Sequence, residues 1–291
     1  MDWHARLLGE VQHRDLRNSQ KVTTTRCRVL IIASVALISL ALTACESPDS
    51  RIAKPETGRP ATATAIPLAS SGVPPILLFN GAGTSANDVV ALETILSNKQ
   101  LSYSTANSSE LNDMSESQFT AYHLLIVPGG NFITIGNNLR SSTTASIRNA
   151  VQNGLNYLGI CAGGFLAGSS QYNSLDLTSG VRFGFYADED RGIRKTAVAI
   201  TAAGGPTLDQ YWEDGPQFAG WGAVVAKYPN GTPAIVEGTS GKGWVILSGV
   251  HPEAPESWRR GMTFTTPVNV DNAYAGTLIH AALNRTRLPH Y

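Results

Sequence analysis

A cysteine in a glycine-rich turn is the residue of this sequence best placed to act as a nucleophile. Cys161 lies in the segment Gly-Ile-Cys-Ala-Gly-Gly, between an apolar run that predicts a strand and residues that predict the start of a helix. A cysteine between small residues at such a turn has the pattern of a nucleophile elbow, G-x-C-x-G. Glycines permit the tight turn and leave the sulfur open to approach. The alternative is a buried structural cysteine, because free cysteine is often a small core residue.

A His-Pro-Glu segment near the C-terminus offers a base for this nucleophile. His251 follows an apolar run, and Glu253 comes two residues later. In near-extended backbone, residues i and i+2 lie on one side, so the carboxylate can orient the imidazole as a catalytic base requires. We expect His123, His280 and His290 to be structural or solvated. For an isolated segment, an ordinary histidine in a proline turn would be the better interpretation.

The N-terminal 44 residues predict a secretory leader. A basic segment precedes an apolar run at residues 29–42, which is short for a membrane-spanning helix and typical of a signal peptide. The run ends in Leu-Thr-Ala-Cys, which resembles the bacterial lipobox. We therefore expect Cys45 to carry lipid, including palmitate, and to anchor the protein to a membrane. The domain would then face the extracytoplasmic side, in the periplasm or at the cell surface. A generic N-terminal anchor is the alternative.

The number and positions of the cysteines favour a chemical role for Cys161. The chain has three cysteines, of which Cys27 would be removed with the leader and Cys45 would be lipidated. Cys161 would then be the one thiol of the mature protein, so no intramolecular disulfide could form even in an oxidising compartment. A lone thiol in such a compartment favours a chemical role.

The order of apolar segments after the leader predicts an α/β fold. Residues 45–75 are rich in Ser, Thr, Ala and Pro and predict a flexible tether. Residues 76–291 predict one domain. A strand at 76–79 is followed by a helix, by strands at 101–105 and 123–127, and by a further helix before the strand that leads to Cys161. This order is typical of a doubly wound, mostly parallel sheet. Ligands of such sheets bind beyond the carboxyl ends of the strands.

The C-terminal half predicts added β-strands. Short apolar runs at residues 224–228, 234–237 and 243–247 are separated by Pro-Asn-Gly and Thr-Ser-Gly turn signals. Asp271 is expected to cap a closing helix that runs through Leu283.

Composition limits the classes of partner. The chain is 42% hydrophobic and 15% charged, with a formal net charge of zero. No Lys/Arg stripe is visible, so we expect no nucleic-acid partner. We also expect no cofactor and no metal ion.

Together these motifs resemble the class I glutamine amidotransferase superfamily, whose fold is flavodoxin-like. The similarity is closest to the amidotransferase-like domain at the N-terminus of some biotin–protein ligases. It rests on a Pro-Gly-Gly loop at residues 128–130, the Gly-x-Cys-Ala-Gly-Gly elbow, a Gly-Pro-x-Phe stretch at residues 215–218 and the Ser-Gly-Val-His-Pro-Glu ending. The resemblance covers residues 76–283.

The resemblance implies a role for each matching residue. Cys161 would be the nucleophile, His251 the base and Glu253 its orienting group. The oxyanion hole would consist of backbone N–H groups, and the residues that could supply them are Gly129, Gly130 and Ala162. The residues expected to border the substrate pocket are Gly81, Tyr211 and Trp212, although aromatic packing explains the last two nearly as well.

No ligase sequence follows the resemblance within the 291 residues, and the expected extracytoplasmic site lacks ATP. We therefore expect hydrolysis of an amide, peptide or related acyl bond in a small-molecule or peptide substrate. A binding module with an idle site is the main alternative. An α/β-hydrolase with a cysteine elbow is weaker, because its acid should precede the histidine.

Overall fold

The computed structural model describes residues 72–291. The predicted leader, Cys45 and most of the predicted tether lie outside this range. Within the described residues, no helix is both long and apolar enough to span a membrane.

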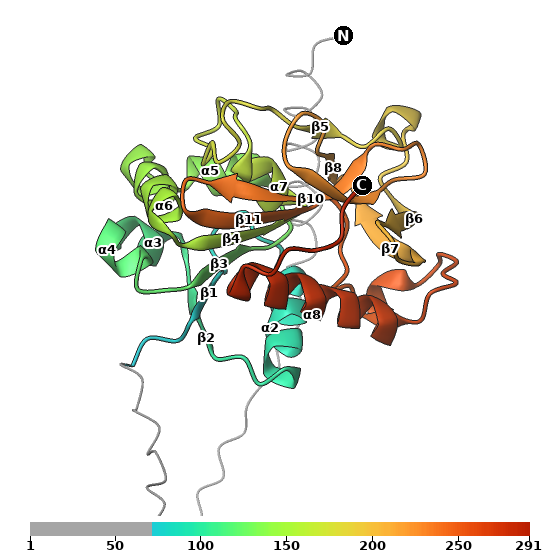
Figure 1. The fold of residues 1–291 in the computed structure, drawn as a ribbon, viewed down its shortest axis with the longest axis horizontal. Coiled ribbons are helices and arrows are strands. Elements are labelled where there is room, and N and C mark those ends of the chain that lie inside the picture. Colours follow the sequence, from blue (N-terminus) through green and yellow to red (C-terminus); the bar gives the residue numbers. More distant parts are fainter. Residues whose placement is uncertain (1–71) are drawn as a thin grey trace, which may run out of the picture. The chain divides into compact units, whose positions relative to one another are not determined.

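A nine-stranded sheet forms the centre of the domain (Figure 1), with the strand order β2-β1-β3-β4-β11-β10-β9-β6-β7. Its first five strands pair in parallel. They are β2 (Tyr103–Ala106), β1 (Ile76–Phe79), β3 (Leu124–Val127), β4 (Asn156–Ile160) and β11 (Gly243–Ser248). Three of them, β1, β3 and β4, are buried along their whole length. Continuous apolar runs of this kind are expected where helices cover both faces of a parallel sheet.

Helices lie on both faces of these strands, which confirms the predicted doubly wound α/β fold. Helices α2 (Ala86–Asn98) and α8 (Val268–Asn284) pack together on one face. The other face carries α6 (Ser141–Asn153) and the shorter helices α3 (Ser108–Asp113), α4 (Glu116–Phe119), α5 (Phe132–Asn137) and α7 (Ala162–Ala167). The core includes fully buried leucines of both the sheet and α2, such as Leu78, Leu92 and Leu124.

The second strand begins later than predicted. The N–H of Leu101 donates to the carbonyl of Leu96 at 2.9 Å. This residue therefore still closes the C-terminus of α2, and β2 starts at Tyr103.

Antiparallel strands extend the sheet in the C-terminal half, as predicted. They are β10 (Pro233–Ser240), β9 (Ala223–Lys227), β6 (Lys195–Ala202) and β7 (Thr207–Glu213). The sequence patterns predicted β9 and β10 but not the β6–β7 hairpin. A small two-stranded sheet, β5 (Gly184–Phe185) with β8 (Pro216–Gln217), and two 3-10 turns, η1 (Glu189–Arg191) and η2 (Glu256–Arg259), complete the domain.

The predicted cap of the closing helix is wrong. Helix α8 begins at Val268 after Pro267, so Asp271 lies inside its first turn. Proline commonly opens helices because it needs no amide partner there. Asp271 is buried, forms an ion pair with Arg259, and accepts a hydrogen bond from Gln210 Nε2 at 2.6 Å.

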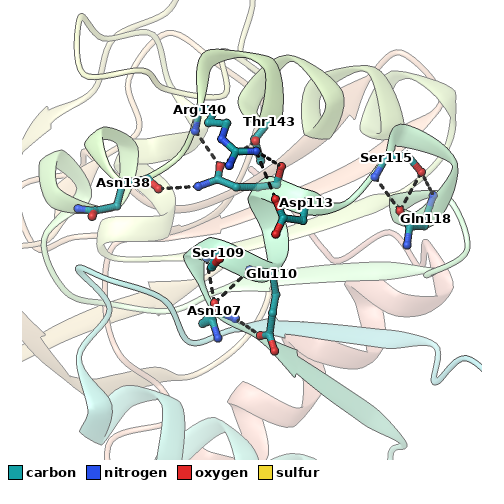
Figure 2. Close-up of polar contacts among 10 residues, drawn as sticks. Asn107, Ser109, Glu110, Asp113, Ser115, Gln118, Asn138, Arg140 and Thr143 are labelled. Carbon is teal, nitrogen blue, oxygen red and sulfur yellow. Dashed lines mark hydrogen bonds and ion pairs between the residues drawn. The ribbon is translucent and has the colours of Figure 1, made fainter.

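A polar network with an exposed ion pair joins α3 to the start of α6 (Figure 2). Asn112 Oδ1 accepts hydrogen bonds from Arg140 N at 2.8 Å and Thr143 Oγ1 at 2.8 Å, and Arg140 forms an ion pair with Asp113 at 3.3 Å. The side chains of this ion pair are 64% and 69% exposed. The Arg140–Asp113 ion pair can therefore be compared, as a solvated pair, with the buried Arg259–Asp271 pair.

We predict that Asp271→Asn lowers the free energy of unfolding by about 3–5 kcal/mol, because it leaves the buried guanidinium of Arg259 without its carboxylate. Asp113→Asn is the matched control and is expected to cost less than about 1 kcal/mol, because solvent screens an exposed pair. Urea unfolding followed by tryptophan fluorescence measures both. Equal effects of the two substitutions would contradict the structural role given to Asp271.

Candidate active site

Cys161 occupies a strained turn between β4 and α7. Its backbone angles are φ 49° and ψ −103°, in the region that side chains other than glycine rarely adopt. Such strain costs about 1–3 kcal/mol and persists only where the surrounding structure imposes it. The residue is 5% exposed. The turn therefore has the backbone form of the predicted nucleophile elbow.

The glycines around Cys161 are required by close packing. A Cβ atom on Gly163 would lie 2.0 Å from the carbonyl oxygen of Val127, and one on Gly159 would lie 2.5 Å from the carbonyl oxygen of Gly163. At Gly164 a Cβ atom would lie 2.8 Å from the ring of Phe218. The elbow backbone thus lies directly against its neighbours, and no larger residue fits at these positions.

The sulfur of Cys161 contacts strand β7. Its Sγ donates a hydrogen bond to the backbone carbonyl of Glu213 at 3.5 Å. The backbone N–H of Cys161 donates to Ser248, the last residue of β11, at 2.7 Å. The elbow is therefore fixed against the strand that leads to His251.

His251 and Glu253 form a buried pair. His251 Nδ1 lies 2.9 Å from Glu253 Oε1, and the two residues are 4% and 1% exposed. The backbone N–H of His251 donates to the carbonyl of Tyr211 at 2.8 Å, which fixes the segment after β11 to β7. The imidazole also meets the rings of Tyr211 and Trp258 edge-on, with centroids 5.7 and 5.9 Å away.

A second carboxylate reaches the same ring nitrogen. Asp88 Oδ1 lies 3.0 Å from His251 Nδ1, and Asp88 is 5% exposed. Asp88 lies in the first turn of α2, where its backbone N–H donates to Ser85 Oγ at 3.4 Å. In the sequence alone, the spacing of Ser85 and Asp88 indicates only the start of a helix. Its spacing could have predicted that the carboxylate is buried, because Asp88 lies on the buried face of α2 with Leu92 and Ile95.

The charges of this cluster shift one another. Burial lowers the pKa of His251, but the negative charges of Glu253, Cys161 and Asp88 outweigh it and leave this pKa well above its usual value. Burial raises the pKa of Glu253, and the His251 charge only partly offsets this. The pKa of Asp88 is lowered, because the charge of His251 and the hydrogen bonds to Asp88 outweigh its burial.

The Pro-Gly-Gly loop adjoins both the elbow and the imidazole. The N–H of Gly163 donates to Pro128 O at 3.2 Å, and a Cβ atom on Gly129 would lie 2.6 Å from His251 Cε1. Gly130 has φ +139°, which favours glycine. Among the loop hydrogen bonds of residues 72–291, the amides of Gly129 and Gly130 donate to no backbone carbonyl. Ala162 is the first residue of α7. The role of these three amides as oxyanion donors stays a prediction.

The three residues expected at the pocket lie in different surroundings. Tyr211 packs beside His251, and its hydroxyl donates to Glu213 Oε2 at 2.6 Å. Trp212 is fully buried in the core, where its Nε1 donates to the carbonyl of Gly215 at 3.2 Å. Gly81 lies in the loop between β1 and α2, where a Cβ atom would lie 2.4 Å from Ser108 Oγ. Tyr211 is the one in ring contact with His251.

A cavity of about 440 Å³ lies between α2, α8 and the segment after His251. Its lining includes Glu253, Trp258 and Asn272, together with Val90 and Lys99. The cavity thus borders Glu253, whose side chain is itself fully buried.

One group of residues has the composition of a metal site. Among residues 72–291, ligand atoms of Asp88, His251 and Glu253 lie within 4.8 Å of one another. The distances of 2.9 and 3.0 Å from Nδ1 are also those of an imidazole N–H between two carboxylates. We interpret the cluster in that way.

We predict that Cys161→Gly is more stable than Cys161→Ala by about 1–3 kcal/mol, because glycine adopts a positive φ without strain whereas alanine retains the strain. Both variants lose the sulfur, so the comparison isolates the backbone. Thermal and urea unfolding of the two variants measure the difference. A Cys161→Ala variant as stable as Cys161→Gly would show that the elbow is relaxed.

Comparisons with solved structures give distant similarities. PurLQS from Thermotoga maritima is 16% identical with a TM-score of 0.48, over 74% of this chain and 100% of that one. A putative GMP synthase subunit from Thermoplasma acidophilum is 11% identical with a TM-score of 0.47, over 73% and 96%. The exo-beta-1,4-mannosidase Op5Man5 from Opitutaceae bacterium strain TAV5 is 14% identical with a TM-score of 0.44, over 70% of this chain and 36% of the other.

A comparison with curated protein sequences gives no match. The family described as "Biotin-protein ligase, N terminal" matches residues 75–276. This match spans the parallel strands, the elbow, the Pro-Gly-Gly loop and the His-Pro-Glu segment, and it confirms the predicted family resemblance. The chain therefore belongs to the biotin-protein ligase N-terminal family.

Proposed function

We propose that this protein is a cysteine hydrolase that cleaves an amide, peptide or related acyl bond through Cys161, His251 and Glu253. The observation that carries the proposal is the strained elbow of Cys161 beside a buried histidine of raised pKa. The charge of Cys161 is one cause of that raised pKa of His251, and we propose that the sulfur attacks as a thiolate paired with the imidazolium. A thiolate held in this way is the form of cysteine that attacks a carbonyl.

In the first half-reaction, the thiolate of Cys161 attacks the substrate carbonyl carbon and forms a C–S bond. The carbonyl electrons move to oxygen, and the N–H groups of Ala162 and of Gly129 or Gly130 stabilise this oxyanion. One such donor contributes about 3 kcal/mol to the transition state. The imidazolium of His251 gives its Nε2 proton to the leaving nitrogen, the C–N bond breaks, and an amine departs from a thioester on Cys161.

In the second half-reaction, neutral His251 accepts a proton from water through Nε2. The hydroxide attacks the thioester carbon, the C–S bond breaks, and the carboxylic acid leaves. The thiolate of Cys161 and the imidazolium of His251 are then restored. Throughout, Glu253 holds Nδ1 at 2.9 Å and keeps the imidazole oriented.

We also propose that this chemistry takes place in the cell envelope, with the domain held by lipid at Cys45. The lipobox-like segment before Cys45 supports this location. In that location, water is the acyl acceptor that we propose.

A binding module on the same fold is the second candidate. The observation that favours it is the environment of Cys161. The residue is 5% exposed, and its thiol donates to the carbonyl of Glu213. In this alternative the site would hold a ligand without forming a covalent bond. The two candidates differ in whether Cys161 reacts.

We predict that the folded full-length protein reacts with iodoacetamide at Cys161, at pH 7, about 10- to 30-fold faster than an ordinary thiol, which is only a few per cent ionised at that pH. His251→Asn should lower the rate to that of an ordinary thiol. Mass spectrometry of the peptide that contains Cys161 measures the rate. A wild-type rate no higher than that of glutathione would favour the binding module.

The substrate can be sought directly at the sulfur. The protein is mixed with cell-envelope extract, quenched in acid, and the mass added to the Cys161 peptide is measured. We expect a thioester adduct that is lost after treatment with hydroxylamine and is absent from Cys161→Ala. If the bound extract component instead dissociates intact from both proteins, the site binds without acyl transfer.

We predict that the protein isolated from a lipoprotein-processing bacterium lacks residues 1–44 and carries acyl chains on Cys45. Cys45→Ala should remove these chains and release the protein from the membrane fraction. Intact mass and fractionation measure the outcome. Membrane retention of unlipidated Cys45→Ala would favour a generic N-terminal anchor.

A further inference from the structure

Two carboxylates compete for one ring nitrogen in the candidate active site. Glu253 Oε1 and Asp88 Oδ1 lie 2.9 and 3.0 Å from His251 Nδ1. A single N–H cannot point at both, because a strong hydrogen bond needs a donor angle above about 150°. Asp88 Oδ1 is indeed buried without a well-aligned donor among the described residues, and so is Glu253 Oε2.

The surroundings hold Asp88 in this position. Its backbone is fixed in the first turn of α2 by the side chain of Ser85. A Cβ atom on Gly129 would lie 2.2 Å from Asp88 Oδ1, so the absence of a side chain at Gly129 gives this oxygen its place beside the imidazole. A carboxylate that served only to cap the helix would have no need of this buried position.

We propose that Asp88 is a second positioning residue of His251. Its carboxylate stays beside the imidazole as an ionised partner when the pH falls and Glu253 binds a proton. This inference rests on the proposed function, in which His251 is the base. Asp88 acts through the imidazole and does not touch the reacting atoms.

The electrostatics of the cluster support this division of roles. Thiolate, two carboxylates and one imidazolium would place three negative charges and one positive charge in a buried site, which is costly. Protonation of Glu253 reduces this excess. Burial raises the pKa of Glu253, whereas the pKa of Asp88 is lowered, so Glu253 binds a proton first as the pH falls.

Each element around the imidazole contributes a defined group. Glu253 comes from the same segment, Asp88 from α2 and Cys161 from the elbow. Tyr211 comes from β7, and burial raises the pKa of its hydroxyl, so it stays neutral. Trp258 from η2 carries no charge. The two carboxylates and the thiolate therefore set the charge of His251.

The test is the titration of His251 in the full-length protein in detergent, followed by NMR of its ring carbon and assigned with His251→Asn. Asp88→Asn preserves the size of the side chain and removes its charge. We expect it to lower the pKa of His251 by about 1–3 units, the effect of one close opposite charge. The iodoacetamide rate at Cys161 should shift along the pH axis in the same direction.

Ser85→Ala is the matched control. It removes the side-chain cap of the same helix and should cost about 1 kcal/mol of stability. Its effect on the pKa of His251 should be smaller than that of Asp88→Asn, because the Asp88 charge remains. If Asp88→Asn leaves this pKa unchanged while Glu253→Gln lowers it, Asp88 is only a helix cap and the proposal is overturned.

A second measurement does not require the variant to fold. Carbon NMR of the side-chain carboxyls in the wild-type protein should show that Glu253 titrates at a higher pH than Asp88. The reverse order would overturn the proposal. Neither titration depends on turnover, so an inactive protein with these titrations would refute the hydrolase and leave the role of Asp88 intact.

Discussion

The close approach of the elbow backbone to the neighbouring strand is the constraint on which the rest of the site depends. A side chain at Gly163 would meet the carbonyl of Val127 at 2.0 Å, and the Gly163 N–H donates to Pro128. Because β3 and β4 are parallel neighbours, the loops after them leave the sheet at the same edge. Because glycine has no side chain, these two loops can be in contact. Their contact fixes the position of Cys161 relative to the amides of the Pro-Gly-Gly loop.

A second constraint is the burial of charge beside that elbow. Buried ionised groups are costly, and apolar residues of similar size would often stabilise a fold more. The domain nevertheless places His251 between Asp88 and Glu253, next to a cysteine with φ 49°. Departures from local rules are expected at functional sites. Strain and buried charge at the same place support a chemical role for the cluster better than a structural one.

The sequence patterns predicted the parallel half of the sheet, because buried strands are continuous apolar runs between turn residues. They missed β7 (Thr207–Glu213), whose Asp and Gln interrupt the apolar pattern. They placed Asp271 at a helix cap because acidic residues favour such positions, although Pro267 had already opened the helix. His251 and Glu253 could be paired through their i, i+2 spacing. Asp88 could not be joined to them, since only the tertiary fold brings α2 to this segment.

The hydrolase and the binding module differ in the position of one proton. In the binding module it stays on the sulfur of Cys161, and in the hydrolase it is on the imidazole of His251. In the structure, the thiol of Cys161 uses its hydrogen to bond the carbonyl of Glu213. Loss of that hydrogen to His251 would turn an attraction into a repulsion between the sulfur and the carbonyl oxygen. The ionised sulfur is then drawn towards the imidazolium, where the negative charges of Asp88 and Glu253 help to keep the proton. The carboxylates behind the imidazole therefore act on the nucleophile in front of it, through the proton that His251 holds.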